Sequence, residues 1–481
     1  MTTMTETTAP AAPQAGVVKL TMLLGGVVFL LMMIFGLLMR VAQGGLIEID
    51  PALFYQILTA HGAGMVGTAG LTGAAILWYF TGRHVPLLAG VYWAFLGLFL
   101  LGVVLILGAI FLGGYAGAWT FLYPLPAMSG GLWHPNAAIV FLLGYTSIGV
   151  GFLLLHLEVM RKLIGAYGGI GGAMAWPLAF GRGRAEEAPP PAVVAAMASS
   201  LFNTLGIVVG AAVLVASIVN LAFPGFAVDA ILAKNMIFFF GHVFINAAIY
   251  MAVIAVYEIV PEYTGKPWKT TRVFAIAWSV VLVFVMAVYP HHLLQDLPMP
   301  TWAMAMGQVV SYFSGIPLIA VTAFSLLVYL RQAKAMRWDL ASALLVLGVA
   351  GWTIGSAPAI LDGMIMVNKV MHNTQWVPGH FHIYLILGEV AMAFGFMAWL
   401  VRREGEALAG LNGAAFWVYL AGGAGFVLMF LVSGALSVPR RWAAHLPEWH
   451  LQAQIASAFA ALVILGVSVF VLRYLARLGR G

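Results

Sequence analysis

The sequence predicts an all-α, polytopic membrane protein, a bundle of about 12 transmembrane helices with both termini in the cytoplasm. Of the 481 residues, 63% are hydrophobic and only 8% are charged. A soluble domain carries about 25% charged residues, so this chain has too few polar side chains to cover a water-soluble fold. Apolar runs long enough to cross a bilayer, at about 20 residues each, recur along the whole chain. We place them at 18–40, 55–80, 87–112, 138–160, 197–222, 235–259, 272–290, 303–330, 339–360, 379–400, 414–437 and 452–475.

Two segments stand apart from these runs. Residues 1–16 are rich in Thr, Ala and Pro, and no basic region or cleavage site precedes the first apolar run. We expect a disordered N-terminal tail and not a signal peptide. Residues 165–195 form the one long polar insert, and their Gly and Pro content predicts an irregular cytoplasmic loop. Residues 17–481 would then form a single membrane domain.

The basic residues indicate the orientation. If the N-terminus lies inside, 17 of the 22 Lys and Arg fall in cytoplasmic loops and tails, as the positive-inside rule requires. The net charge of +6 therefore reflects membrane topology, and we expect lipid and no nucleic acid as a partner. The five basic residues on the outer side are Arg40, Lys234, Lys369, Arg440 and Arg441.

The chain has 12 His and no Cys. Without Cys there are no disulfides, iron–sulfur clusters or covalently attached c-type hemes, so a metal must be held by His, Met or carboxylates. On the predicted orientation, six histidines from four spans lie in the outer third of the bilayer. Ionisable groups inside a membrane are costly and usually functional, so these six are the candidate cofactor ligands. They are His61, His242, His291, His292, His380 and His382.

The spacing of these histidines separates two kinds of site. His380 and His382 are two positions apart, so they point to nearly opposite faces of a helix and can ligate two planar hemes. A low-spin heme needs a second His, for which His61 is the candidate. His242, His291 and His292 remain, and three imidazoles without a carboxylate favour copper over iron. Of the other histidines, we expect His84, His134, His156 and His450 to be interfacial or loop residues, and His445 is ambiguous.

Three outer residues are candidate partners for heme propionates. Arg440 and Arg441 oppose the positive-inside trend, and a guanidinium binds a carboxylate through two hydrogen bonds. His372, eight residues before His380, could donate a further hydrogen bond.

The motifs HNTQWVPGHFH, YPHHL, FFGHVFINAAIYMAVIAVYEIVP and SVPRRW resemble subunit I of the heme–copper oxidase superfamily, most closely its B-family. The resemblance runs from about Thr59 to the C-terminus. It implies that His61 and His382 ligate a low-spin heme and that His380 ligates a high-spin heme. It also implies that His242, His291 and His292 bind one copper ion, with iron less favoured. We expect hemes of the b type, although the sequence does not name the type.

The sequence departs from the family at the position four residues after His242. Oxygen reductases of the B-family have a cross-linked Tyr there, whereas this chain has Asn246. Tyr250 and Tyr289 are near in sequence, but neither has the family's register. Reduction of two NO molecules to nitrous oxide splits no O–O bond and does not need this Tyr. Asn246 could donate a hydrogen bond to a bound intermediate, or it could serve only helix packing.

Several acids and one Tyr complete the candidate site. Glu389 follows His382 by two helical turns and lies on nearly the same face of the helix. It could be a proton carrier or a structural acid. Asp296 and Asp362 could line a proton entrance from the outer side or be solvated. Tyr289, or alternatively Tyr257, is a candidate for the missing Tyr if the enzyme reduces oxygen.

The sequence therefore predicts a respiratory enzyme of the bacterial inner membrane that reduces nitric oxide at a heme–copper centre. The alternative is an oxygen reductase, with cytochrome c or quinol as donor and with or without proton pumping. A heme-free transport protein is a third hypothesis. Because the chain has no Cys, we expect electrons from a second subunit, cytochrome c-like or cupredoxin-like, or directly from quinol.

Overall fold

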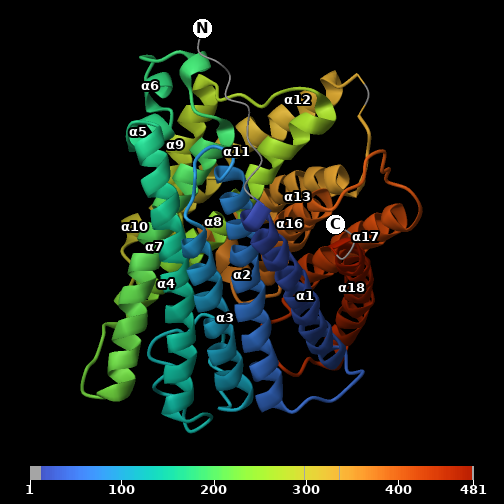
Figure 1. Ribbon diagram of the computed structural model, residues 1–481. Coiled ribbons are helices and arrows are strands. Elements are labelled where there is room, and N and C mark those ends of the chain that lie inside the picture. Colours follow the sequence, from blue (N-terminus) through green and yellow to red (C-terminus); the bar gives the residue numbers. More distant parts are fainter. Residues whose placement is uncertain (1–11, 297, 335, 479–481) are drawn as a thin grey trace.

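The computed structural model of the chain describes residues 12–296, 298–334 and 336–478. Within them, 12 spans are long and apolar enough to cross a membrane, which confirms the predicted all-α class. Eight spans are single helices, packed side by side in Figure 1. They are α1 (Ala12–Gln43), α2 (Pro51–Thr81), α3 (Ala89–Phe111), α4 (Pro135–Ala166), α7 (Pro191–Ala222), α8 (Ala230–Thr264), α13 (Leu340–Asp362) and α17 (Gly410–Ala435).

The other four spans are built from more than one piece. In the tenth span, for example, the residues after His382 form a π-helix, a wide turn that is often found at functional sites. The pieces are α9 (Arg272–Ala287) with η2 (Tyr289–Leu293); α10 (Thr301–Phe313), α11 (Ile316–Leu318), η3 (Ile319–Ala323) and α12 (Phe324–Gln332); α15 (Trp376–His382), η4 (Ile383–Val390) and α16 (Ala391–Leu400); and η5 (Pro447–Trp449) with α18 (His450–Leu478).

The connections differ in part from the prediction. The helix α1 already begins at Ala12, within the stretch expected to be a tail; residues 1–11 of that stretch lie outside the described residues. The predicted loop 165–195 is shorter, because α4 continues to Ala166 and α7 begins at Pro191. The insert also contains short helical turns, namely α5 (Ile170–Ala173), α6 (Trp176–Ala179) and η1 (Ala185–Glu187). A further short helix, α14 (Ile365–Met371), connects the ninth and tenth spans.

Three spans form the centre of the bundle. In α2, α8 and the tenth span, 78%, 83% and 89% of the most apolar stretch is buried in the protein, against 22–44% in the other nine. The remaining spans therefore shield these three from lipid. The three central spans carry His61, His242, His380 and His382.

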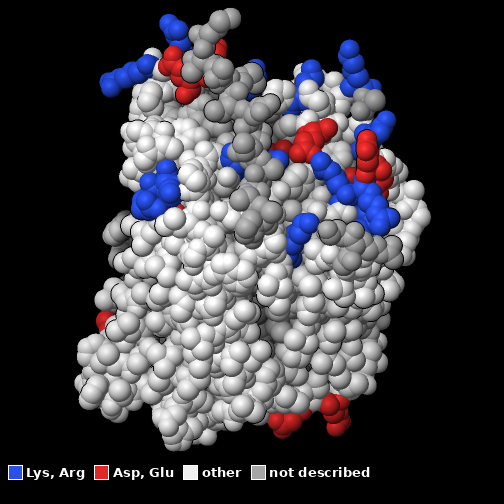
Figure 2. All heavy atoms as spheres, viewed as in Figure 1, with Lys and Arg blue, Asp and Glu red and all other residues white. Residues whose placement is uncertain are grey.

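The charges are distributed as the predicted orientation requires. Figure 2 shows most Lys and Arg side chains of this face near the end where α5, α6 and α12 lie in Figure 1. Most of the middle of this face is uncharged, and the opposite end shows Asp and Glu. The cytoplasmic placement of the N-terminus stays a prediction from this pattern.

Candidate heme and metal centre

His61 and His382 face each other across the interior. Their ring centroids are 6.3 Å apart and their planes are within 15° of parallel. This is too far for direct ring contact. If one iron atom lies between the two rings, the distance between their centroids is the sum of two metal–imidazole bonds of about 2 Å and half the width of each ring. This sum is about 6 Å. The separation therefore fits one heme iron held between two axial histidines.

Main-chain carbonyls orient both rings of this pair. His61 Nδ1 lies 2.7 Å from the carbonyl oxygen of Met32, and His382 Nδ1 lies 2.6 Å from that of Pro378. A carbonyl only accepts, so each Nδ1 carries the proton. Each Nε2 then keeps a free lone pair for a metal, as second-shell partners of ligating histidines usually arrange.

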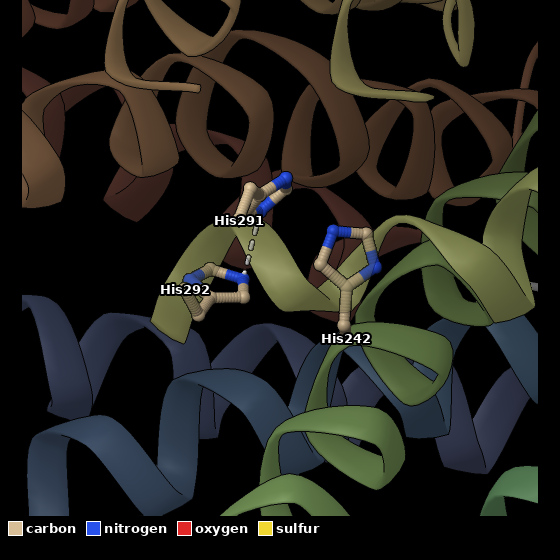
Figure 3. Close-up of side chains that lie close together, drawn as sticks. All are labelled: His242, His291 and His292. Carbon is tan, nitrogen blue, oxygen red and sulfur yellow. Dashed lines mark hydrogen bonds between the residues drawn. The ribbon is translucent and has the colours of Figure 1, made fainter. Parts of the chain in front are cut away.

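The three histidines predicted to bind copper converge. In Figure 3 the rings of His291 and His292 from η2 and of His242 from α8 turn toward one another. One nitrogen from each ring lies within 4.8 Å of the other two. His291 Nε2 and His292 Nε2 are 3.0 Å apart. The 3-10 turn that begins at Tyr289 and contains Pro290 allows two adjacent residues to face one point, which a regular α-helix does not.

Side chains support two of these three histidines. His291 Nδ1 lies 2.7 Å from Ser311 Oγ, and this hydroxyl donates its own proton to the carbonyl oxygen of Gly307. Ser311 must therefore accept from His291 Nδ1–H, which leaves His291 Nε2 for the metal. The Asn246 amide nitrogen lies 2.8 Å from His242 Nδ1 and 2.9 Å from the carbonyl oxygen of His242. This contact holds the ring in place, but a hydrogen bond donated to Nδ1 leaves the imidazole proton on Nε2, so it does not free Nε2 for a metal.

One cavity of about 480 Å³ joins these groups. All six predicted histidines line it, together with Asn246. On the outer side His380 Nδ1 lies 3.7 Å from the carboxylate of Asp362. The second outer acid, Asp296, forms an ion pair of 2.6 Å with Lys234. The donor set and the gap between His61 and His382 fit two hemes and one further metal, and one cavity reaches all six histidines.

The cavity also reaches the predicted propionate partners, since Arg440 and Arg441 line it. Burial and the charge of Arg441 lower the pKa of Arg440 to about 10, so the guanidinium stays charged at neutral pH. His372 does not line the cavity. Burial and the charge of Arg440 lower the pKa of His372 to about 4, so its imidazole is neutral and can donate one hydrogen bond.

Sequence reasoning missed Arg40 as a site residue. Arg40 lies 9% exposed at the end of α1 and lines the cavity. It donates to the Gln375 side chain at 2.9 Å and lies 4.6 Å above the ring of Phe430, which stacks on His382. A buried cation next to the axial pair is a third candidate for binding a propionate. A charge at the end of an apolar span was the signal, but it was read as topology alone.

Two candidate catalytic residues lie away from the cavity. Glu389 is fully buried and accepts a hydrogen bond of 3.0 Å from Thr72, but it does not line the cavity. The prediction that it shares the face of His382 assumed a regular α-helix, and the π-helix η4 changes that register. Tyr289 also does not line the cavity, because its hydroxyl donates to Asn235 at 3.1 Å.

The prediction that His156 is an interfacial or loop residue is wrong. It is fully buried between α4 and α7. Its Nδ1 donates to Ser200 at 3.1 Å, and its Nε2 accepts from the Asn203 amide at 2.8 Å. Both nitrogens are satisfied, so a polar cluster between two helices accommodates this histidine without a metal.

Comparison with known proteins identifies the family. Residues 16–467 match the family model described as Cytochrome C and Quinol oxidase polypeptide I. The chain belongs to this family. It is thus a heme–copper oxidoreductase subunit I, a multi-pass membrane protein of respiratory type. The family implies hemes and a binuclear metal centre, and a group of three histidines that could hold a metal ion is present.

Individual relatives of this oxidase family support the assignment. The chain is 27% identical over 270 residues to cytochrome c oxidase subunit 1 of Thermus thermophilus, covering 51% of this chain and 48% of that protein. It is 25% identical over 250 residues to cytochrome c oxidase polypeptide 1 of Halobacterium salinarum, covering 50% and 40%. The chain thus spans about half the length of these relatives, or less.

A solved structure has the same fold. A cryo-EM structure of a heme–copper terminal oxidase dimer superposes with a TM-score of 0.78 at 21% identity, covering 97% of this chain and 84% of that chain. At this identity the match concerns the fold.

Proposed function

We propose that this protein is the catalytic subunit of a membrane-bound oxygen reductase. The observation that carries the proposal is the joint placement of a facing His pair, a single His380 and a three-histidine cluster around one cavity. Oxygen rather than another substrate is supported by the relatives, which are named cytochrome c oxidases.

Each group has proposed ligands. His61 and His382 would hold a low-spin heme, His380 a high-spin heme, and the three-histidine cluster one copper ion. Arg40, Arg440 and Arg441 would bind propionates, and the hemes are proposed to be of the b type. When bound, the high-spin heme and the copper would supply electrons to a gas molecule between them. The residues of the chain orient these groups, exclude bulk water and supply protons.

The same proposal includes an electron donor, an oxidase complex and a membrane location. A second subunit with a cytochrome c-like or cupredoxin-like domain, or quinol, would deliver electrons to the low-spin site. The structural relative is an oxidase dimer, which supports membership in an oxidase complex. A bacterial inner membrane is the proposed location.

Nitric oxide reduction is the second candidate, and Asn246 favours it. The Asn246 side chain donates to His242 and lines the cavity, at the position where the resemblance to oxygen reductases predicts a cross-linked Tyr. An amide can hydrogen-bond a bound nitrogen oxide but cannot release a hydrogen atom as a phenol can. Joining two NO molecules requires only two electrons and two protons, with no O–O bond to split.

Turnover with the two gases distinguishes these functions. The purified protein, in complex with its donor subunit or supplied with reductant, is assayed for oxygen uptake and, without oxygen, for nitrous oxide formation. We expect oxygen uptake to exceed NO turnover at least tenfold. Nitrous oxide formation with negligible oxygen uptake would overturn the main proposal and support the second. Absence of a heme absorption band would refute both.

An Asn246→Ala variant tests the role of the amide in the second candidate. If NO is the substrate, nitrous oxide formation should fall at least tenfold because a hydrogen-bond donor to the bound gas is lost. Asn220→Ala is the matched control, because Asn220 is a buried amide that donates to the carbonyl oxygen of Phe226, away from the cavity. Equal rates in both variants would show that Asn246 serves packing only.

A further inference from the structure

Tryptophan and tyrosine rings form a continuous run of contacts that starts at the cavity. Trp352 of α13 and Tyr250 of α8 both line the cavity, and their ring centroids are 6.3 Å apart. The contacts continue from Tyr250 to Trp278 of α9 at 5.7 Å, and from Trp278 to Tyr257 of α8 at 6.4 Å. These separations are those of directly packed aromatic pairs. The run therefore passes between three helices and leads away from the cavity.

The far end of the run reaches the surface. Tyr257 packs against Trp268, in the loop between α8 and α9, with centroids 5.0 Å apart, and Trp268 meets Tyr329 of α12 edge-on at 5.0 Å. Trp268 is buried, whereas Tyr329 is only partly buried. In Figure 1, α12 lies at the end of the molecule where Figure 2 shows most Lys and Arg of this face. Tyr329 is thus the ring of the run that water reaches, on the side predicted to be cytoplasmic.

The residue types of the run indicate more than packing. The chain has 30 Phe, 15 Trp and 16 Tyr, and a Phe ring packs in a core without a polar atom that needs a partner. Phe202 and Phe274 pack against the run without interrupting it. Among the described residues, the ring contacts of Tyr145, another cavity-lining Tyr, are to Phe121 and Phe141. Phenol and indole rings lose one electron far more readily than benzene rings, so the run from Trp352 and Tyr250 is one that an electron can follow.

The cavity contains side chains that oxidation damages. Met33, Met39 and Met65 line it, and a thioether is readily oxidised to the sulfoxide. Reduction of oxygen to two water molecules takes four electrons and four protons. When the donor delivers fewer electrons, an oxidising equivalent stays in the cavity beside these residues. A route by which the protein itself can supply the missing electron protects them.

We propose that this run of rings carries electrons from a cytoplasmic thiol to partly reduced oxygen in the cavity, and so removes oxidising equivalents; the inference goes beyond the proposed function and rests on it. The oxygen species takes one electron from Trp352 or Tyr250 and one proton from water. Each oxidised ring is reduced by the next ring outward, and Tyr329 is reduced by the thiol. An oxidised phenol releases its proton to water and regains one on reduction.

The electrons and protons of this route balance. Two thiols give two electrons and two protons and form one disulfide. Each oxidising equivalent that is removed consumes one electron and one proton, so the protons released by the thiols replace those taken up. The chain itself has no Cys that could take part in this exchange, and the rings return to their starting state.

A break in the middle of the run tests the proposal. Trp278→Phe keeps a packed ring but removes the readily oxidised indole. Hydrogen peroxide, which supplies oxidising equivalents without a donor, is added to the purified protein in the presence of glutathione. We expect inactivation at least threefold faster than in the unmodified protein, and at least threefold more sulfoxide at Met65 by mass spectrometry. The initial rate of oxygen uptake and the heme spectra should be unchanged.

Trp78→Phe is the matched control. Trp78, like Trp278, is fully buried and packs against a Tyr, with its centroid 5.1 Å from that of Tyr92, but it lies outside the cavity and outside the run. Its inactivation and its sulfoxide content should stay within twofold of the unmodified protein. Trp268→Phe breaks the run at another link and decides the question if Trp278→Phe does not assemble.

Radical spectra test the exit of the run. Electron paramagnetic resonance of samples frozen after peroxide addition should show a tyrosyl signal, which Tyr329→Phe should reduce at least twofold and which added glutathione should shorten in life. If this signal is unaffected by Tyr329→Phe, or if Trp278→Phe is damaged no faster than Trp78→Phe, the inference is wrong while the proposed function stands. If the unmodified protein does not reduce oxygen, the proposed function itself fails.

Discussion

The two histidine sites of this protein are supported in different ways. The facing pair His61 and His382 is oriented by the main chain, through the carbonyl oxygens of Met32 and Pro378. The Pro378 contact lies within one helical turn, whereas the Met32 contact joins α2 to α1, and neither needs a particular side chain at the accepting residue. Substitution of those neighbours therefore leaves the acceptor in place, and the axial site depends on the fold itself.

The three-histidine cluster depends on side chains instead. Ser311 accepts from His291, and the Asn246 amide donates to His242. Either partner can be removed by one substitution without a change in the backbone. The comparison indicates that the facing pair is held by the main chain, whereas the three-histidine cluster is the part that substitution can tune.

Removal of ligands should have the largest effect and should separate the two sites. In His382→Ala the low-spin heme loses an axial ligand, so its absorption band should disappear while copper content is retained. In His291→Ala copper content should fall at least tenfold while both heme bands persist. Redox difference spectra and metal analysis measure both quantities. Loss of both cofactors in both variants would show that the sites are not independent.

Removal of a supporting side chain should have an intermediate effect. Ser311→Ala leaves His291 Nδ1–H without an acceptor, and loss of such a partner lowers metal affinity by about 10–100-fold. Copper retention during titration with a chelator measures this loss. Ser217→Ala is the control. The Ser217 hydroxyl donates to the carbonyl oxygen four residues earlier, as the Ser311 hydroxyl does, but it accepts no hydrogen bond from a histidine. Equal copper retention in the two variants would refute the role of Ser311.

Removal of an ion cluster far from both histidine sites should have the smallest effect and should change neither site. The cluster consists of Glu406, Arg473 and Arg477. Burial alone would raise the pKa of Glu406, but hydrogen bonds from Arg477 and Arg473 outweigh burial and lower it to about 2. A carboxyl with a lowered pKa stabilises the fold above its unfolded pKa of about 4.5, and this stability is lost as pH falls toward 2. The deficit in Tm of Glu406→Gln should therefore shrink between about pH 6 and about pH 3.

Two measurements check this third prediction. Thermal unfolding of both proteins across that pH range gives the difference in Tm, and heme spectra should be the same in both at neutral pH. A deficit that is independent of pH would mean that Glu406 acts through packing. A changed heme spectrum would mean that the ion cluster around Glu406 and the facing pair His61 and His382 are coupled.

Sequence reasoning succeeded where residue type and membrane depth limit the possibilities. Burial of ionisable groups in lipid is so costly that His residues at one depth indicate a shared site, and the structure brings all six to one cavity. The same reasoning failed for His156, because a sequence does not show that Ser200 and Asn203 of another helix satisfy both of its nitrogens.

The register of irregular segments also required the structure. Glu389 was assigned to the face of His382 from α-helical spacing, but the π-helix between them places it beside Thr72. Tyr289 lies next to Pro290 in sequence, yet its hydroxyl turns to Asn235 and away from the cavity. The intrinsic preferences of the residues do not distinguish an α-turn from a π-turn or a 3-10 turn. Which of these turns forms depends on how the segment packs against neighbouring helices.

The sequence by itself determined the class of the fold and the 12 spans, and it marked the six histidines that line one cavity, because hydrophobic length and the spacing of ionisable residues are local properties. Only the tertiary structure decided the hydrogen-bond partners of those histidines and which phenols face the cavity. Asn246 illustrates the division: the sequence marks it as a departure from a family pattern, and the fold gives it His242 as a partner. Such partners lie on turns or helices whose relative placement depends on packing of the whole bundle.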